Sequence, residues 1–447
     1  MSLSNALAVA IEALSWIEIE GMSERQAVFR SSNQLEVKDP RSLRLSQLLV
    51  LESTRRRNLL DKLLSLADPS LRYENMKAGP RSFARVYTYW TVIRGANRDT
   101  ILALLRAGRK LLGWRELAPL ELTFGRMLGL RSEDVFSEAS ETQAIALRTF
   151  NPEWFVDYCM RTFGRKKAME ILKGEESLPP TYIRINTLAE DESVTVEKMK
   201  QTDTNMKKVR GMKYVYSVLR SRGPMLTSKI ARLGNIQVQD KSSCLTVLAA
   251  KPRPRQVVLD VCAAPGTKTS FLAQLMRNRG TIYAIDISER RMNLWMKEMK
   301  RMNVKIANPL VADVRQPLPL GVDADVVVLD PPCSNSGTFA KVPSAKWRIR
   351  LSDFNKFSQI QLQMLHCCAD RVRIGGRLIY STCSISVEEN EEVIEAFLRQ
   401  DPRFRLTDFE PKLGEPGMRG LDKCRRFYPH LDDCNGYFTA AMIRNAC

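Results

Sequence analysis

Thiols and carboxylates follow apolar runs of this sequence directly. Asp286 ends the run TIYAID, Asp313 ends LVAD, and Asp330 ends ADVVVLD, with Cys333 three residues later. Cys383 ends the run GRLIYSTC. Such runs predict buried strands, and the carboxyl ends of parallel strands are where open α/β sheets bind their ligands. The pattern therefore predicts a site at one edge of a sheet.

The two cysteines at strand ends indicate a specific chemistry. If their strands are neighbours, the ends lie about 4.8 Å apart, so that Cys333 and Cys383 face one pocket. A pair of thiols without metal-ligand spacing favours thiolate addition, because a few per cent of cysteine is already thiolate at neutral pH. The alternative is that both are small buried apolar residues.

Two prolines follow Asp330 and predict a rigid, extended loop. This loop would hold the Asp330 carboxylate and the backbone near Pro331 in place. A carboxylate and a carbonyl together accept hydrogen bonds from an exocyclic amino group, such as that of cytosine.

The run VVLDVCAAPGTKT predicts a strand from Val257, a tight turn and a helix from Lys268 to Arg277. Strand, turn and helix N-terminus form the unit that holds nucleotide-like ligands in α/β sheets. The pattern G-x-G-x-x-G is absent, which argues against a dinucleotide. An ordinary connecting turn is the alternative.

Asp286 follows Gly266 by 20 residues, where a doubly wound sheet places an acceptor for ribose hydroxyls. Asp313, at the next strand end, would meet an adenine or its neighbouring groups. Each of these acids alone also fits a helix N-cap.

Composition limits the possible binding partners of the protein. The chain has 447 residues, and 69 Lys and Arg against 50 Asp and Glu give a net charge of +19, which favours nucleic acid as a partner. An unspecific basic surface is the alternative.

No apolar run approaches the roughly 20 residues of a membrane span, and we expect no membrane partner. Ten cysteines without a C-x-x-C pair, and no secretory signal, predict reduced thiols, a cytoplasmic location and no metal.

Periodicity predicts three domains. Residues 1–145 show helical spacing throughout and many arginines; Tyr87 and Trp90 among them fit a helix core better than base stacking. Residues 146–235 mix helix and strand signals and predict a small α+β module. Residues 236–447 alternate strands and helices, which predicts an α/β fold with a parallel sheet covered on both faces.

These motifs closely resemble the RNA cytosine-C5 methyltransferases of the Sun/Fmu (RsmB-like, NOP2/Sun) family. The resemblance runs from about residue 150 to the end, through NPEWFV, PPTYIRINT, IQVQDKSS, CAAPGTKT, DPPCSNSG, YSTCS and NGYFTAAMIR. It implies a Rossmann-like S-adenosylmethionine-dependent methyltransferase sheet after an RRM-like linking module, and the basic helical front resembles a NusB-like RNA-binding domain. Two departures are Thr267, where the family has a second glycine, and Asn435-Gly436-Tyr437-Phe438 in place of D-G-F-F.

The resemblance also implies roles for residues. Cys383 would attack C6 of a cytosine, Asp330 would hold the base, Cys333 would remove the C5 proton or expel Cys383, and Lys268 would favour the thiolate. From these residues alone, the reverse assignment of the two cysteines stays open. The resemblance places S-adenosylmethionine against Cys262, Ala263, Ala264, Pro265, Gly266, Thr267, Lys268, Asp286, Asp313 and Asp330.

The family resemblance favours ribosomal RNA as the substrate, with transfer RNA as the alternative, and we expect a monomer. A non-catalytic ribosome-assembly or RNA-binding factor is the competing function, and the presence of Asp330, Cys333 and Cys383 together argues against it.

Overall fold

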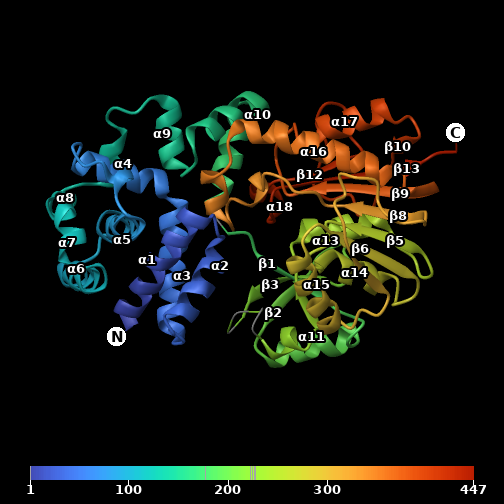
Figure 1. Ribbon diagram of the computed structural model, residues 1–447, viewed down its shortest axis with the longest axis horizontal. Helices are drawn as coiled ribbons and strands as arrows, with labels where there is room; N and C mark the ends of the chain where they lie inside the picture. The colour runs from blue at the N-terminus through green and yellow to red at the C-terminus, as the bar shows by residue number, and fades with distance from the viewer. Residues whose placement is uncertain (1, 177, 222, 224, 226–227, 447) are drawn as a thin grey trace. The chain divides into compact units, whose positions relative to one another are not determined.

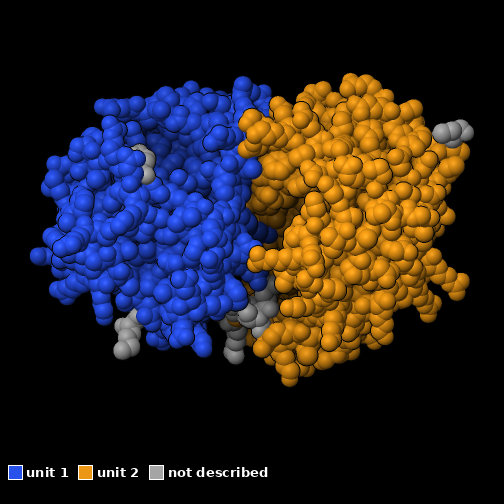
Figure 2. Space-filling model, in the orientation of Figure 1, with its two compact units in different colours: residues 1–177, 339–351 blue, residues 178–338, 352–447 orange. Residues whose placement is uncertain are grey.

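The computed structural model of the chain describes all residues except 1, 177, 222, 224, 226–227 and 447. Contacts group the chain into two compact units, which Figure 2 distinguishes by colour. Unit 1 comprises residues 1–177 and 339–351, and unit 2 comprises residues 178–338 and 352–447. The small module predicted at 146–235 is thus divided between the units, and most of it groups with the large sheet. The three-domain division itself stays a prediction.

Unit 1 is helical, as its periodicity predicts (Figure 1). Its core includes Tyr87, which is buried, whereas Trp90 packs partly buried against that core, so the core interpretation of these aromatics holds. Gly164 has φ +72° and breaks one long helix into the predicted pair. The helices are α1 Ser2–Glu20, α2 Glu24–Gln34, α3 Pro40–Arg55, α4 Arg57–Ala67, α5 Ala78–Thr88, α6 Arg98–Leu112, α7 Trp114–Leu117, α8 Glu121–Met127, α9 Glu141–Arg148 and α10 Glu153–Gly174.

A segment from the second half of the sequence also belongs to unit 1. Residues 339–351 contain the short helix η7, Pro343–Trp347. Arg55 donates to the carbonyl of Ala340 at 3.1 Å, and the backbone N–H of Ser344 donates to Glu24 at 2.6 Å. The segment follows Thr338 directly, so the chain leaves unit 2 five residues after Cys333 and returns to it at Ser352.

Unit 2 begins with a small antiparallel sheet in the order β2-β3-β1-β4. Arg184 on β1 is fully buried and donates to Gln239 at 3.1 Å and to Ser270 at 2.7 Å, which joins this sheet to the helix at Thr267–Leu275. The elements are β1 Thr181–Ile185, α11 Glu192–Gln201, β2 Asn205–Lys208, β3 Val215–Arg220, α12 Lys229–Arg232 and β4 Ile236–Val238.

The main sheet of unit 2 has nine strands, with order β11-β12-β13-β9-β8-β5-β6-β7 and β10 beside β13. The strands from β5 to β9 are parallel to one another, as the sequence predicts, whereas β13 is antiparallel to β9. Their bounds are β5 Val257–Val261, β6 Thr281–Asp286, β7 Ala307–Val311, β8 Ala324–Leu329, β9 Val372–Thr382, β10 Phe404–Leu406, β11 Glu415–Pro416, β12 Arg425–Phe427 and β13 Tyr437–Arg444.

Helices cover both faces of this sheet because apolar side chains of each strand alternate between two cores. Leu259, Val327 and Leu378 face the core with α16 and α17, whereas Val258 and Val328 face the core with α13 and α14. Figure 1 shows these helices against the sheet. The helices are α13 Lys241–Ala250, α14 Thr267–Leu275, α15 Glu289–Arg301, α16 Leu351–Ala369, α17 Glu391–Gln400 and α18 Pro429–Asp432.

The strand order brings the predicted site to one edge. Val261 on β5 pairs with Leu329 on β8, and Leu329 pairs with Tyr380 on β9. The segments after β8 and β9, which carry Cys333 and Cys383, therefore start side by side. In the described part of the chain, no helix combines the length and apolarity that crossing a membrane needs.

Candidate active site

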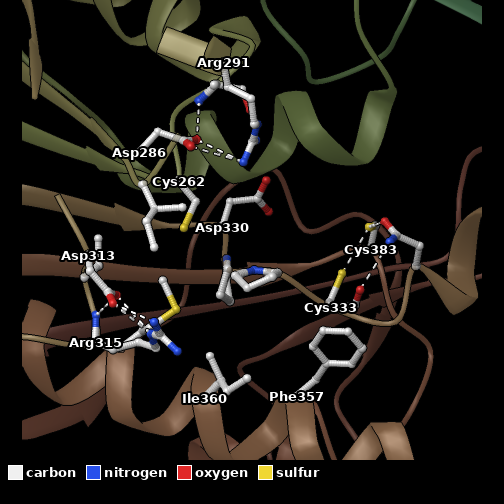
Figure 3. A pocket seen from close by; sticks show the side chains of 17 residues that line it. Cys262, Asp286, Arg291, Asp313, Arg315, Asp330, Cys333, Phe357, Ile360 and Cys383 are labelled. Carbon is white, nitrogen blue, oxygen red and sulfur yellow. Dashed lines mark hydrogen bonds and ion pairs between the residues drawn. The ribbon is translucent and has the colours of Figure 1, made fainter. Parts of the chain in front are cut away.

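A cavity of about 600 Å³ opens at the carboxyl edge of the main sheet (Figure 3). Its volume lies in the range of small-molecule sites, about 300–1,000 Å³. Of the residues that the sequence singles out, the following line it: Cys262, Ala264, Asp286, Asp313, Asp330, Cys333 and Cys383.

The two predicted thiols meet in this cavity. The Sγ atoms of Cys333 and Cys383 lie 3.2 Å apart, in contact but well beyond the roughly 2.05 Å of a disulfide bond. Cys383 is partly exposed and donates to Oδ1 of Asn335 at 2.9 Å, whereas Cys333 is buried. The hydrogen bond with Cys383, followed by burial, raises the pKa of Cys333 well above its usual range. Cys333 therefore keeps its proton at neutral pH, and Cys383 is the more exposed of these two thiols.

Asp330 is held by three donors. Lys268 Nζ lies 2.5 Å from Oδ2, while the hydroxyls of Ser381 and Tyr437 donate to Oδ1 at 3.0 and 3.1 Å. Burial, the largest single influence, lowers the pKa of Lys268, but the charge and hydrogen bond of Asp330, together with Tyr437 and Asp260, outweigh it and raise that pKa. Burial raises the pKa of Tyr437, so its hydroxyl remains a donor. The Asp330 carboxylate is thus fixed in one orientation, and Lys268 acts on it directly.

Asp286 ties the turn after β5 to the start of α15. It accepts from the backbone of Ala264 at 3.2 Å and of Ser288 at 3.1 Å, and it pairs with Arg291 at 3.2 Å. Ser288, rather than Asp286, is the N-cap of α15, so the cap interpretation of Asp286 is wrong.

Asp313 lies below Asp286 in the view of Figure 3, with Arg315 beside it. Its two oxygens bind the guanidinium of Arg315 at 2.6–3.1 Å, and its Oδ1 accepts from the backbone of Arg315. The hydrogen bonds from Arg315 lower the pKa of Asp313. Both residues line the cavity.

The turn after β5 contributes fewer residues than the sequence predicts. Ala263, Pro265, Gly266, Thr267 and Lys268 are all described, yet they are not among the residues that line the cavity. A Cβ on Gly266 would lie 2.5 Å from Met299 and 3.0 Å from Trp295. Close packing of α15, together with φ +105°, therefore requires glycine at this position.

Sequence reasoning missed several lining residues. Asn335 contacts the thiol of Cys383, and Arg291 covers Asp286. Phe357, Ile360 and Met364 line the cavity from α16, and their spacing of three and four residues is a signal that could have indicated one face of that helix. Nothing in the local sequence shows that this face meets the strand ends.

Among the described residues, no group of three or more His, Cys, Asp or Glu side chains is placed to hold a metal ion. The site is built instead from three thiols, three carboxylates, two guanidinium groups and apolar walls.

The parallel strands, their covering helices and the carboxyl-edge cavity define a Rossmann-like methyltransferase of the S-adenosylmethionine-dependent class. Residues 247–443 match the family described as 16S rRNA methyltransferase RsmB/F. Over these residues, and over those that the relatives below match, the chain is similar to ribosomal RNA methyltransferases.

Two relatives illustrate the similarity. The probable ribosomal RNA small subunit methyltransferase B of Bacillus subtilis (strain 168) is 29% identical over 308 residues, 67% of each chain. The 25S rRNA (cytosine-C(5))-methyltransferase nop2 of Schizosaccharomyces pombe is 30% identical over 295 residues, 63% of this chain and 48% of the relative. The chain thus spans about two thirds of the bacterial relative and about half of the yeast one.

Solved structures share the fold. The crystal structure of PH0851 has a TM-score of 0.86 and 27% identity, and the match covers 99% of both chains. A methyltransferase homolog from Pyrococcus horikoshii has a TM-score of 0.62 and 29% identity over 69% of this chain and all of that one. NSun6 from Pyrococcus horikoshii with SFG, at 23% identity, covers 66% of this chain and 99% of its own with a TM-score of 0.61, and shows the fold alone.

Proposed function

We propose that this protein transfers a methyl group from S-adenosylmethionine to C5 of a cytosine in RNA, and that the RNA is ribosomal. The observation that carries the proposal is the pair of thiols 3.2 Å apart, in the same cavity as a carboxylate held by three donors. Cytosine C5 is not nucleophilic until a thiolate adds at C6, so this chemistry needs a thiol and a group that binds the base.

The cavity fits the cofactor on its own features. Asp286 offers a buried carboxylate at the end of β6, the position of a ribose acceptor in this fold. Ile287 beside it is an apolar side chain with 59% exposure that lines the cavity, and a flat apolar ring would cover it. Arg291 is half exposed, so its side chain can move when a hydroxyl approaches Asp286. When bound, S-adenosylmethionine supplies an electrophilic methyl group.

The protein's own residues carry the other steps. Cys383, as thiolate, adds to C6 of the cytosine, while Asp330 accepts from the base and stabilises its protonated N3. Cys333 keeps its proton because its pKa is raised, and it contacts Cys383. As the bond from sulfur to C6 breaks, the proton of Cys333 passes to the departing sulfur of Cys383, and the thiolate left on Cys333 takes the proton that C5 loses. The target base must leave its stack, because C6 within a helix is out of reach of a thiol.

Cys383 rather than Cys333 is proposed as the nucleophile for two reasons. The family resemblance assigns this role to the thiol of the T-C-S motif. In addition, Cys383 is partly exposed, whereas Cys333, which also lines the cavity, is only 8% exposed. A nucleophile has to reach its substrate, and exposure favours Cys383.

Ribosomal RNA is proposed from the names of the relatives, which act on small-subunit and 25S RNA. The test is incubation of the purified protein with labelled S-adenosylmethionine and separate pools of ribosomal and transfer RNA, followed by bisulfite sequencing. Label at one cytosine of ribosomal RNA is the expected result. Label in transfer RNA alone would overturn the substrate, and absence of both label and cofactor binding by calorimetry would favour the assembly factor.

A further inference from the structure

A buried glutamate lies between the two thiol-bearing loops. Glu389 is completely buried in unit 2, and its carboxylate accepts five hydrogen bonds. Oε1 accepts from the hydroxyls of Ser334, Ser384 and Ser386 at 2.5, 2.6 and 2.9 Å. Oε2 accepts from the backbone of Ser334 at 2.8 Å and from Gln361 at 3.0 Å.

The donors come from both sides of the site. Ser334 follows Cys333 directly, and Ser384 follows Cys383 directly. Gln361 on α16 also donates to the carbonyl of Pro332 at 3.0 Å. Glu389 is therefore bound to the immediate neighbours of both cysteines and to the helix that supports the first loop.

Further hydrogen bonds connect the loops to each other. The hydroxyls of Ser336 and Ser384 lie 2.9 Å apart, and the backbone of Gly337 donates to the carbonyl of Cys383 at 2.9 Å. The backbone of Ile385 donates to Ser336 at 3.0 Å. These contacts leave the serine hydroxyls oriented toward a single acceptor, the Glu389 carboxylate.

Only a carboxylate suits this position. An ionised carboxylate is purely an acceptor with about four lone-pair sites, which matches donors that arrive from every direction. A buried charge is stable only when such bonds compensate its lost hydration. An amide in place of the carboxylate turns one acceptor oxygen into a donor that faces either the backbone N–H of Ser334 or the serine hydroxyls, and the loops must rearrange.

We propose that Glu389 is a positioning residue for methyl transfer: it clamps residues 332–337 to residues 383–386 and so holds the sulfurs of Cys333 and Cys383 in contact. This inference rests on the proposed function for its effect on catalysis, but not for its effect on the thiols. Electrostatics supports the clamp. The hydrogen bond with Cys383 and burial are the largest causes that raise the pKa of Cys333, and the charge of Glu389 raises it further.

The test uses phenylarsine oxide, which binds two neighbouring thiols. Each thiol loses its proton to the oxygen of the reagent, two As–S bonds form, and one water leaves without a change of oxidation state. The full-length protein should bind it through Cys333 and Cys383, and Cys333→Ala gives the background from all other cysteines. Glu389→Gln, which keeps the size but loses the charge, should bind it about tenfold more weakly, the loss expected from roughly one ordering hydrogen bond.

Glu391→Gln is the matched control, because Glu391 is equally buried two residues away but pairs with Arg426. It should leave capture of the reagent unchanged. Equal capture by Glu389→Gln and the wild type, with folding verified by circular dichroism, would overturn the proposal. If Glu389→Gln does not fold, Ser386→Ala removes one donor at 2.9 Å and should show a smaller loss; unchanged capture there also counts against the clamp.

Methyl transfer provides the second measurement. In Glu389→Gln the kcat should fall about 100-fold, the cost of a displacement of about 1 Å, with KM for RNA nearly unchanged. A loss confined to KM would contradict a positioning role. If the wild type methylates no RNA but Glu389→Gln still captures less reagent than the wild type, the clamp stands and the proposed function is rejected. Failure of the clamp and failure of the proposed function therefore give different results.

Discussion

Tyr437 places its hydroxyl 3.1 Å from Asp330 and 3.3 Å from Ser381. The related family pattern has phenylalanine at this position, so the hydroxyl is a feature of this chain. It adds a third donor to the carboxylate that is proposed to hold the base, beside Lys268 and Ser381. One phenolic hydroxyl thus contributes to the orientation of this carboxylate.

Tyr437→Phe should therefore lower kcat for methyl transfer about tenfold, since a hydrogen bond to a charged group contributes about 1.5–3 kcal/mol. Because burial raises the pKa of Tyr437, the hydroxyl stays protonated and the effect should be the same at every pH where the enzyme is folded. Steady-state rates across the pH range check this. Tyr216→Phe is the control, because its hydroxyl donates to Glu192 in the small sheet. Equal kcat in Tyr437→Phe and wild type would contradict the role.

The sequence identified the reacting groups better than their supports. Asp330, Cys333 and Cys383 were predicted from apolar runs that stop, because strand ends are visible in the local pattern. Glu389 was not, because it lies in VEENEE, which resembles a solvated acidic helix start. One of its partners, Ser334, lies 55 residues earlier in the chain, a contact that no local pattern contains.

At the scale of elements, the strand β5 and the helix α14 share a buried acid. Asp260 is 1% exposed and accepts from Thr269 at 2.5 Å, while its Oδ1 has no hydrogen-bond partner. Burial raises the pKa of Asp260 to about 7, although Thr269 opposes the shift. The folded protein therefore holds this proton more tightly than the unfolded chain does.

This shift predicts a pH-dependent stability. The stabilisation from protonated Asp260 is complete below about pH 4, the unfolded pKa, and is lost as the pH rises through the folded value. Between pH 5 and 8 the free energy of unfolding of the wild type should fall relative to Asp260→Asn by up to about 3 kcal/mol. Urea unfolding of both proteins at pH 5 and pH 8 measures this difference in the free energy of unfolding. The same change with pH in both proteins would exclude the raised pKa of Asp260.

The element pattern was largely predictable because it is local. The strand–turn–helix unit at 257–277, the parallel strands and the kink at Gly164 all follow from apolar periodicity and glycine. The sequence did not predict that β8 and β9 are neighbours, and the convergence of the two cysteines was expected only if they are. Pairing between strands about 50 residues apart depends on the whole sheet.

At the scale of the whole molecule, the chain separates into two units where the sequence predicts three domains. Residues 339–351 join unit 1 although they follow the Cys333 loop. The sequence could not predict this, because the segment is held by residues about 300 positions away, such as Glu24 and Thr54.

The net charge of +19 predicts how RNA binding responds to salt. Not all basic residues contribute, because Arg55 and Arg85 are buried and paired with acids. Exposed ones remain on unit 1, among them Arg41, Arg44, Lys62, Arg94, Arg98 and Arg106. The logarithm of RNA affinity should fall with the logarithm of salt concentration with a slope of about −2 or steeper, equivalent to about three phosphate contacts. Fluorescence anisotropy with labelled RNA measures the slope, and a flat response would mean that the charge has another role.

The central proposal is that Cys383 forms a covalent bond to RNA and that Cys333 releases the RNA from it. The most direct measurement is a denaturing gel of Cys333→Ala incubated with S-adenosylmethionine and ribosomal RNA, with the linked residue mapped by mass spectrometry. We expect a covalent protein–RNA complex through Cys383, which is lost in Cys333→Ala/Cys383→Ala. An adduct through any other residue, or a Cys383→Ala protein that methylates RNA at the wild-type rate, would contradict the claim.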